Sequence, residues 1–154
     1  MAKKFPYHTQ ETGYTCGPAS MRMVLEYIGI KKTEKQIAKL LETNKVRGTW
    51  PKYFPELAEK YKLEYSVERK ATIKDIKHLL NEGYLVIICY YYAAGNVDHY
   101  SVIKKIDSRY IHFWDPDPKC GPEDKYSIKY FEKIWKTDPR YKDKERRWVF
   151  AMKK

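Results

Sequence analysis

The chain has 154 residues, of which 43% are hydrophobic and 16% aromatic, and its formal net charge at pH 7 is +11. A chain of this length and apolar content can bury a sizeable core, which excludes a largely disordered protein. The lysines are spread along the chain among glutamates, which is typical of a solvated basic surface. Binding of nucleic acid or of an acidic partner remains the alternative interpretation of this charge.

The sequence predicts a single domain over residues 1–154 in a soluble, cytoplasmic protein. Its first ten residues, MAKKFPYHTQ, lack the apolar stretch of a signal peptide. The longest apolar run, residues 84–94, is shorter than the about 20 residues that a membrane-spanning helix needs. Its three cysteines form no even disulfide framework, and this favours a reducing compartment.

The first half of the chain has the periodicity of amphipathic helices. Apolar residues at helical spacing predict a helix over about 16–27, which Gly29 ends. Thr33 lies three residues before Gln36 in the segment TEKQ, a capping box that starts a second helix. Two further helices are predicted, one over about 52–62 and one that begins at Thr72 and stops at Gly83.

The second half of the chain is rich in β-branched and aromatic residues, which favour strands. The predicted strands cover 84–92, 99–107, 110–115 and 146–152, with a short helix over 127–135. A tight turn at 107–109 should join the second and third strands as a hairpin. Helices followed by mostly antiparallel strands predict an α+β fold.

Cys16 lies at the junction between a polar loop and the first predicted helix. The positive end of the helix dipole and the free N–H groups at that end both favour a thiolate, the nucleophilic form of cysteine. Gly17 and Pro18 suit a helix start. A small apolar residue tucked under the loop fits this position equally well, so position alone does not decide between the two.

A thiolate nucleophile needs an imidazole base and a group that orients it. Of the four histidines, His99 begins a strand directly after the turn-like segment AAGNVD, a place that suits catalysis. His8 lies in the N-terminal loop, His78 on the fourth helix and His112 inside a strand. His99 is therefore the candidate base, although a loop histidine without a role is the plain alternative.

Asp115 is the candidate orienting group, because it ends the strand expected to pair with that of His99. In the predicted hairpin, the start of one strand and the end of the other share an edge of the sheet. Asp117, Asp98 and Asn96 are rivals on the same grounds. Asp115 also lies in the turn-forming segment DPDP, so a purely structural role remains open.

Acyl transfer also needs hydrogen-bond donors for an oxyanion. The backbone N–H of Cys16 can supply one, and the loop through Gly13 can bring the Gln10 amide round as another. Cys89 falls inside the strongest strand and should be core, whereas Cys120 is a loop thiol and a weaker rival nucleophile. No His or Cys pair has zinc-ligand spacing, so neither a metal nor a cofactor is expected.

The segment QETGYTCGPASMRMVLEYIG resembles the active-site segment of the bacteriocin-processing, or double-glycine leader, peptidases and their stand-alone relatives, which belong to the papain-like cysteine peptidase clan. LLNEGYLVII and the His-Tyr-x-Val-Ile pattern at His99 resemble a second block of that family. IHFWDP resembles a third. The three blocks occur in the family's order and cover nearly the whole chain.

This resemblance implies a papain-like fold and cleavage of peptide bonds through an acyl-enzyme. It implies that Cys16 is the nucleophile, His99 the general base, Asp115 the group that orients His99, and Gln10 part of the oxyanion hole. A peptide or protein would be the substrate, with possible cleavage after Gly-Gly.

Two other functions stay open at this point. The same triad serves acyltransferases and amidotransferases of the clan. A basic, non-catalytic binding module is the other, and its best support is the segment KTDPRYKDKERRW, residues 136–148.

Overall fold

A computed structural model of the chain describes residues 3–95, 97–136 and 146–154. Asn96 and most of the basic segment 136–148 lie outside the described residues. The helices are α1 (Cys16–Tyr27), α2 (Glu34–Leu40), α3 (Tyr53–Lys60), α4 (Ile73–Asn81) and α5 (Ile128–Ile134). The strands are β1 (Glu64–Glu68), β2 (Leu85–Tyr92), β3 (Val97–Ile106), β4 (Tyr110–Trp114), β5 (Asp124–Ser127) and β6 (Val149–Lys153).

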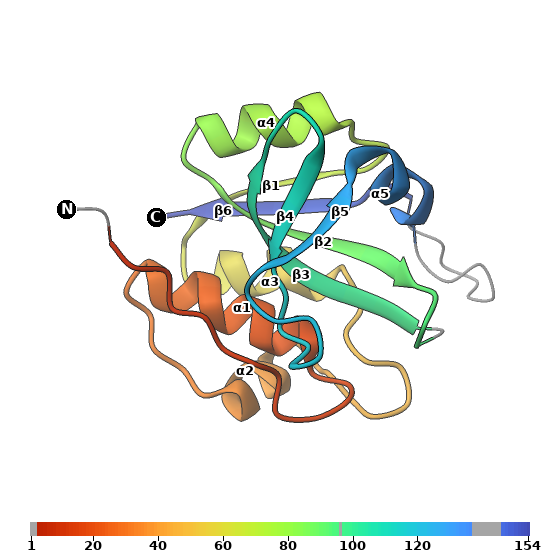
Figure 1. Cartoon of the computed structure of the whole chain (residues 1–154). Coiled ribbons are helices and arrows are strands. Elements are labelled where there is room, and N and C mark those ends of the chain that lie inside the picture. The colour runs from red at the N-terminus through yellow and green to blue at the C-terminus, as the bar shows by residue number, and fades with distance from the viewer. Residues whose placement is uncertain (1–2, 96, 137–145) are drawn as a thin grey trace.

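A six-stranded antiparallel sheet in the order β1-β6-β2-β3-β4-β5 forms the middle of the described structure. Helices α1, α2 and α3 cover one face of the sheet, and α4 and α5 cover the other (Figure 1). The predicted α+β class is confirmed, and the sheet lies between two helical layers.

The central strand β2 is buried on both faces, which explains its nearly continuous apolar sequence. Successive side chains of a strand point to opposite faces. Ile87 and Cys89 accordingly join the core under α1 and α3. Val86, Ile88 and Tyr90 join the core under α4 and α5.

Local sequence signals set the ends of several helices as expected. Thr33 forms a capping box with Gln36 at the start of α2, and Thr72 forms one with Asp75 at the start of α4. Gly29 follows the C-terminal end of α1 at a φ of 100°, a left-handed conformation that glycine adopts without strain.

The strands β1 and β5 were missed by the sequence prediction, and both lie at edges of the sheet. β1 reads EYSVE, in which Tyr65 and Val67 alternate with polar residues, but the alternation covers only five residues and no position is fully buried. The last strand, β6, inserts between β1 and β2. None of the helices in the described residues has the length and apolar character needed to cross a membrane.

Candidate active site

Cys16 is the first residue of α1, and the preceding residue, Thr15, does not cap the helix with its side chain. The Thr15 hydroxyl instead accepts a hydrogen bond from the backbone N–H of Thr12 at 3.1 Å. A threonine cap normally stabilises a helix by about 1 kcal/mol. Without it, the positive end of α1 remains available to a negative charge at Cys16 or on a bound group.

Glu34, on α2, holds the loop that leads to Cys16. Its side chain is buried, with 2% of its surface exposed. Its carboxylate accepts hydrogen bonds from the backbone N–H of Glu11 at 2.9 and 3.2 Å. Burial raises the pKa of Glu34, and the hydrogen bonds from Glu11 and Thr15 oppose that rise. The loop is therefore fixed to α2 as well as to α1.

A close contact at Gly17 and two hydrogen bonds of Tyr100 fix the start of α1 against its neighbours. A Cβ atom at Gly17 would lie only 2.7 Å from the hydroxyl oxygen of Thr49, so the loop before α3 requires glycine here. The Tyr100 hydroxyl donates to the carbonyl of Thr49 at 2.7 Å. The backbone N–H of Tyr100 donates to Sγ of Cys16 at 3.4 Å, which stabilises negative charge on the sulfur.

His99 lies on β3 next to Tyr100, and only 5% of its surface is exposed. Its Nε2 is 2.7 Å from Oδ1 of Asp115, which leaves Nδ1 as the ring nitrogen for the hydrogen bond to Cys16. Burial lowers the pKa of His99. The negative charge of Cys16 and the hydrogen bonds to Asp115 and Cys16 outweigh burial and raise that pKa to about 10.

Asp115 directly follows β4 and is 1% exposed. Besides His99, it accepts hydrogen bonds from the backbone N–H of Asp117 at 2.9 Å and from the hydroxyl of Tyr90 at 3.3 Å. The Tyr90 hydroxyl also bonds to Ser101 at 2.9 Å. Of the rivals to Asp115, Asp117 instead accepts from the backbone of Lys119 with its own carboxylate.

Gln10 lies on the N-terminal segment beside Asp115. Its backbone N–H donates to the carbonyl of Pro116 at 2.8 Å, and its side-chain amide donates to the carbonyl of Thr12 at 2.8 Å. Its side-chain oxygen is buried and has no partner among the described residues. The amide is thus held inside the loop that ends at Cys16, and it has a second N–H that this loop bond does not use.

The other three histidines each pair with a carboxylate away from Cys16. His8 pairs with Glu26 at 2.9 Å, His78 with Glu82 at 3.0 Å, and His112 with Asp107 at 2.7 Å. Among the described residues, the contact between His99 and Asp115 is the histidine–carboxylate pair in which both side chains are buried.

The remaining cysteines have different surroundings from Cys16. Cys89 is 2% exposed and packs in the core under α1 and α3. Cys120 lies between β4 and β5, where burial and the charges of Asp115 and Asp124 raise its pKa to about 12. Cys120 therefore stays a neutral thiol at physiological pH, which is a poor nucleophile.

Asp124 was missed in the sequence. A carboxylate oxygen of Asp115, Sγ of Cys120 and a carboxylate oxygen of Asp124 lie within 4.8 Å of one another. The oxygens of Asp115 already accept the hydrogen bonds described above, and Cys120 keeps its proton, so we assign no metal to this group. Asp124 belongs to β5, a four-residue strand too short and polar to be recognised in the sequence. Its position beside Asp115 is therefore seen only in the folded structure.

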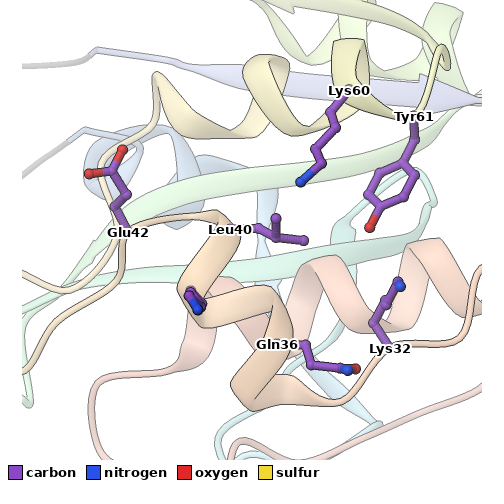
Figure 2. A pocket seen from close by; sticks show the side chains of 7 residues that line it. Lys32, Gln36, Leu40, Glu42, Lys60 and Tyr61 are labelled. Atoms are coloured by element: carbon purple, nitrogen blue, oxygen red, sulfur yellow. The ribbon is translucent and has the colours of Figure 1, made fainter.

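A separate basic hollow of about 470 Å³ lies between α2 and the end of α3 (Figure 2). Lys32, Lys60 and the hydroxyl end of Tyr61 point toward the same space. The other lining residues are Gln36, Lys39, Leu40 and Glu42. None of the candidate catalytic residues lines this hollow, so we treat it as a feature of the basic surface.

The described structure places a cysteine at the start of a helix, and that helix packs on an antiparallel sheet that carries a buried histidine and aspartate. This is the arrangement of the papain-like cysteine peptidase fold. The chain belongs to the Peptidase_C39 like family, whose model matches residues 2–142.

Solved structures share this fold. The peptidase domain of Streptococcus ComA, a bi-functional ABC transporter involved in a quorum-sensing pathway, superposes with a TM-score of 0.75 at 20% identity, covering 98% of this chain and 100% of that one. A putative C39-like peptidase from Bacillus anthracis gives 0.77 at 16% identity, covering 97% and 94%. A double glycine motif protease from an AMS/PCAT transporter, in complex with the leader peptide, gives 0.69 at 20% identity, covering 97% and 93%.

Relatives in sequence include an uncharacterized protein of Methanothermobacter marburgensis. It is 29% identical over 107 residues, which are 70% of this chain and 68% of that protein. A protein of Methanothermobacter thermautotrophicus, also uncharacterized, is 29% identical over 111 residues with the same coverage.

Proposed function

We propose that the chain is a cysteine peptidase that forms a single domain over residues 1–154 and acts through Cys16, His99, Asp115 and Gln10. The observation that carries this proposal is the buried position of His99 between Cys16 and Asp115. A buried imidazole between a thiol and a carboxylate is the arrangement that activates a sulfur nucleophile.

In the proposed reaction, the Cys16 thiolate attacks the carbonyl carbon of the scissile peptide bond. The resulting oxyanion is stabilised by the backbone N–H of Cys16 and the Gln10 amide, aided by the uncapped start of α1. The His99 imidazolium then donates its proton to the departing amine, and a thioester on Cys16 remains. Water attacks this thioester and gives one proton to His99, and cleavage of the thioester carbon–sulfur bond releases the carboxylic acid and regenerates the thiolate.

Asp115 fixes the ring of His99 during both steps. Its bond to Nε2 directs Nδ1 at Cys16 and stabilises the positive ring. Because Asp117 and Tyr90 also donate to Asp115, the carboxylate is itself held in one orientation. Removal of this carboxylate should reduce turnover even though Asp115 forms no bond with the substrate.

The proposed substrate is a peptide or protein segment cleaved after Gly-Gly. The support is the family, together with a structural neighbour described as a double glycine motif protease in complex with a leader peptide. A site that admits only glycine beside the cut would produce this preference sterically.

The experiment is a cleavage assay on peptides that contain Gly-Gly, Gly-Ala, Ala-Gly or Ala-Ala at one position. Mass spectrometry locates each cut and detects the thioester intermediate. Cys16→Ala should abolish cleavage, whereas Cys89→Ala, which removes a core thiol, should retain it. Equal activity of the Cys16→Ala variant and the original chain would overturn the proposal. Transfer of the acyl group to an added amine without hydrolysis would identify an acyltransferase instead.

A further inference from the structure

Asp124, the first residue of β5, lies next to Asp115, the residue that pairs with His99. In the sheet, Asp124 pairs with Phe113 of β4, two residues before Asp115. A carboxylate oxygen of Asp115 and one of Asp124 lie within 4.8 Å of each other, and a hydrogen bond between the two side chains contributes to the pKa shifts of both. Oδ2 of Asp124 is buried and receives no hydrogen bond among the described residues. The two carboxyl groups therefore lie side by side, with Asp115 buried and Asp124 partly buried.

Two carboxyl groups can share a hydrogen bond only while one of them keeps its proton, and the negative charge of one disfavours ionisation of the other. The surroundings decide which one keeps it. Asp115 accepts from His99, Asp117 and Tyr90, three donors that favour its charged form. Asp124 has one buried oxygen without a partner among the described residues and accepts one backbone hydrogen bond, from Lys125. The proton therefore belongs to Asp124, and Asp115 carries the negative charge.

We propose that Asp124 is a positioning residue for this site: its neutral carboxyl group donates a hydrogen bond to Asp115 and keeps that carboxylate aimed at His99. The consequence for reactivity rests on the proposed function, because it is expressed through the nucleophilicity of Cys16. The protonation of Asp124 itself does not depend on any peptidase activity.

The proposed hydrogen bond depends on pH. Burial and the contact with Asp115 raise the pKa of Asp124 to about 7. Among the described residues, six titratable groups lie close enough to Asp124 to interact with its charge, and His99 is the positively charged one. The groups are Tyr7 of the N-terminal segment, Tyr90 of β2, His99 of β3, Asp115, Cys120 and Tyr126 of β5.

The sign of the pH effect follows from this raised pKa. Below about pH 7, Asp124 is neutral and holds Asp115. As the pH rises through 7, Asp124 loses its proton and places a second negative charge beside Asp115. The hydrogen bond is then lost, the two carboxylates repel each other, and the alignment of His99 with Cys16 loosens.

The test compares Asp124→Asn with Asp124→Ala in the full chain. Asparagine has nearly the shape of the neutral acid and can donate from its amide at every pH, whereas alanine cannot donate. Two readouts are measured from pH 5 to 9: the rate at which iodoacetamide alkylates Cys16, and the titration of the His99 ring by NMR. Glu123→Gln is the matched control, because Glu123 is the neighbouring acid and its side chain is 89% exposed.

At pH 6, alkylation of Cys16 in Asp124→Asn should match the original chain, and Asp124→Ala should be slower by about tenfold, as expected for a lost hydrogen bond to a charged group. The original chain and Glu123→Gln should show an additional step near pH 7 in the His99 titration, which Asp124→Asn lacks. If Asp124→Asn is as slow as Asp124→Ala, or the step persists in Asp124→Asn, the inference is wrong.

These readouts also separate this inference from the proposed function. Alkylation and NMR need no peptide turnover, so the step near pH 7 can be present in a chain that cleaves no peptide. A chain that cleaves peptides but shows the same titration in all variants would leave the proposed function standing and overturn the role of Asp124. Thermal unfolding of each variant identifies any loss that comes from misfolding.

Discussion

Nε2 of His99 and Oδ1 of Asp115 lie 2.7 Å apart although 16 residues separate them along the chain. The hairpin of β3 and β4 creates this contact: Val102 pairs with Trp114, so the start of β3 lies beside the end of β4. Both side chains are almost completely buried. An ion pair in such a place is screened little by solvent, so it can hold the ring firmly.

The charge state of His99 yields the first prediction. Because its pKa is raised to about 10, the imidazolium should persist through neutral pH, and the loss of its proton should reduce turnover as the pH rises through about 10. Asp115→Asn removes a hydrogen bond to an anion and should move that fall to lower pH. NMR titration of the His99 ring measures both values. A ring that titrates near its ordinary pKa in the original chain would contradict the proposed contacts.

The Gln10 amide yields a prediction that separates stabilisation of the oxyanion from activation of the thiol. Gln10→Ala should reduce peptide cleavage on the order of 10²–10³-fold, as for other lost oxyanion donors. Alkylation of Cys16 should stay unchanged, because that reaction forms no oxyanion. Equal losses in both reactions would instead mean that Gln10 shapes the loop before Cys16.

The close approach of Gly17 to Thr49 predicts a steric effect. Gly17→Ala places a Cβ 2.7 Å from the Thr49 hydroxyl, so either α1 or the loop before α3 must move. We expect a lower melting temperature and slower alkylation of Cys16. Combining Gly17→Ala with Thr49→Gly, which removes the clashing side chain, should restore part of both. If Gly17→Ala alone is as stable and as reactive as the original chain, the loop before α3 moves without loss of stability and the steric prediction is wrong.

A substitution away from the site serves as a stability control. Thr72→Ala removes the capping box of α4 and should reduce the free energy of unfolding by about 1 kcal/mol. Helix α4 lies on the face of the sheet opposite α1 (Figure 1), so alkylation of Cys16 should be unchanged in the folded protein. A matching loss of reactivity would mean that global stability, rather than local geometry, controls Cys16.

Much of this fold could be predicted from local signals in the sequence. A capping box located the start of α2, Thr72 and apolar periodicity located α4, and the run of β-branched and aromatic residues located β2. The contact of His99 with Asp115 followed from one short turn. These features depend on neighbouring residues, which is the information that periodicity and turn chemistry contain.

The parts that were missed depend on strand pairing rather than on a pattern within the segment itself. β1 and β5 are short, polar edge strands that exist because β6 and β4 offer them hydrogen bonds. Asp124 belongs to β5, so its approach to Asp115 had no local signal. Likewise, nothing in the sequence near Cys16 indicates that Glu34 holds the loop before it.

The most direct test of the account is alkylation of the native protein by iodoacetamide below pH 7, where a free thiol with a pKa of about 8.5 is mostly protonated. Mass spectrometry reports the rate for each cysteine in the original chain and in His99→Ala. The account predicts that Cys16 reacts much faster than Cys89 and Cys120, and that His99→Ala removes this advantage. The central claim would be contradicted if Cys16 reacts no faster than a free thiol, or if its alkylation rate is the same in His99→Ala as in the original chain.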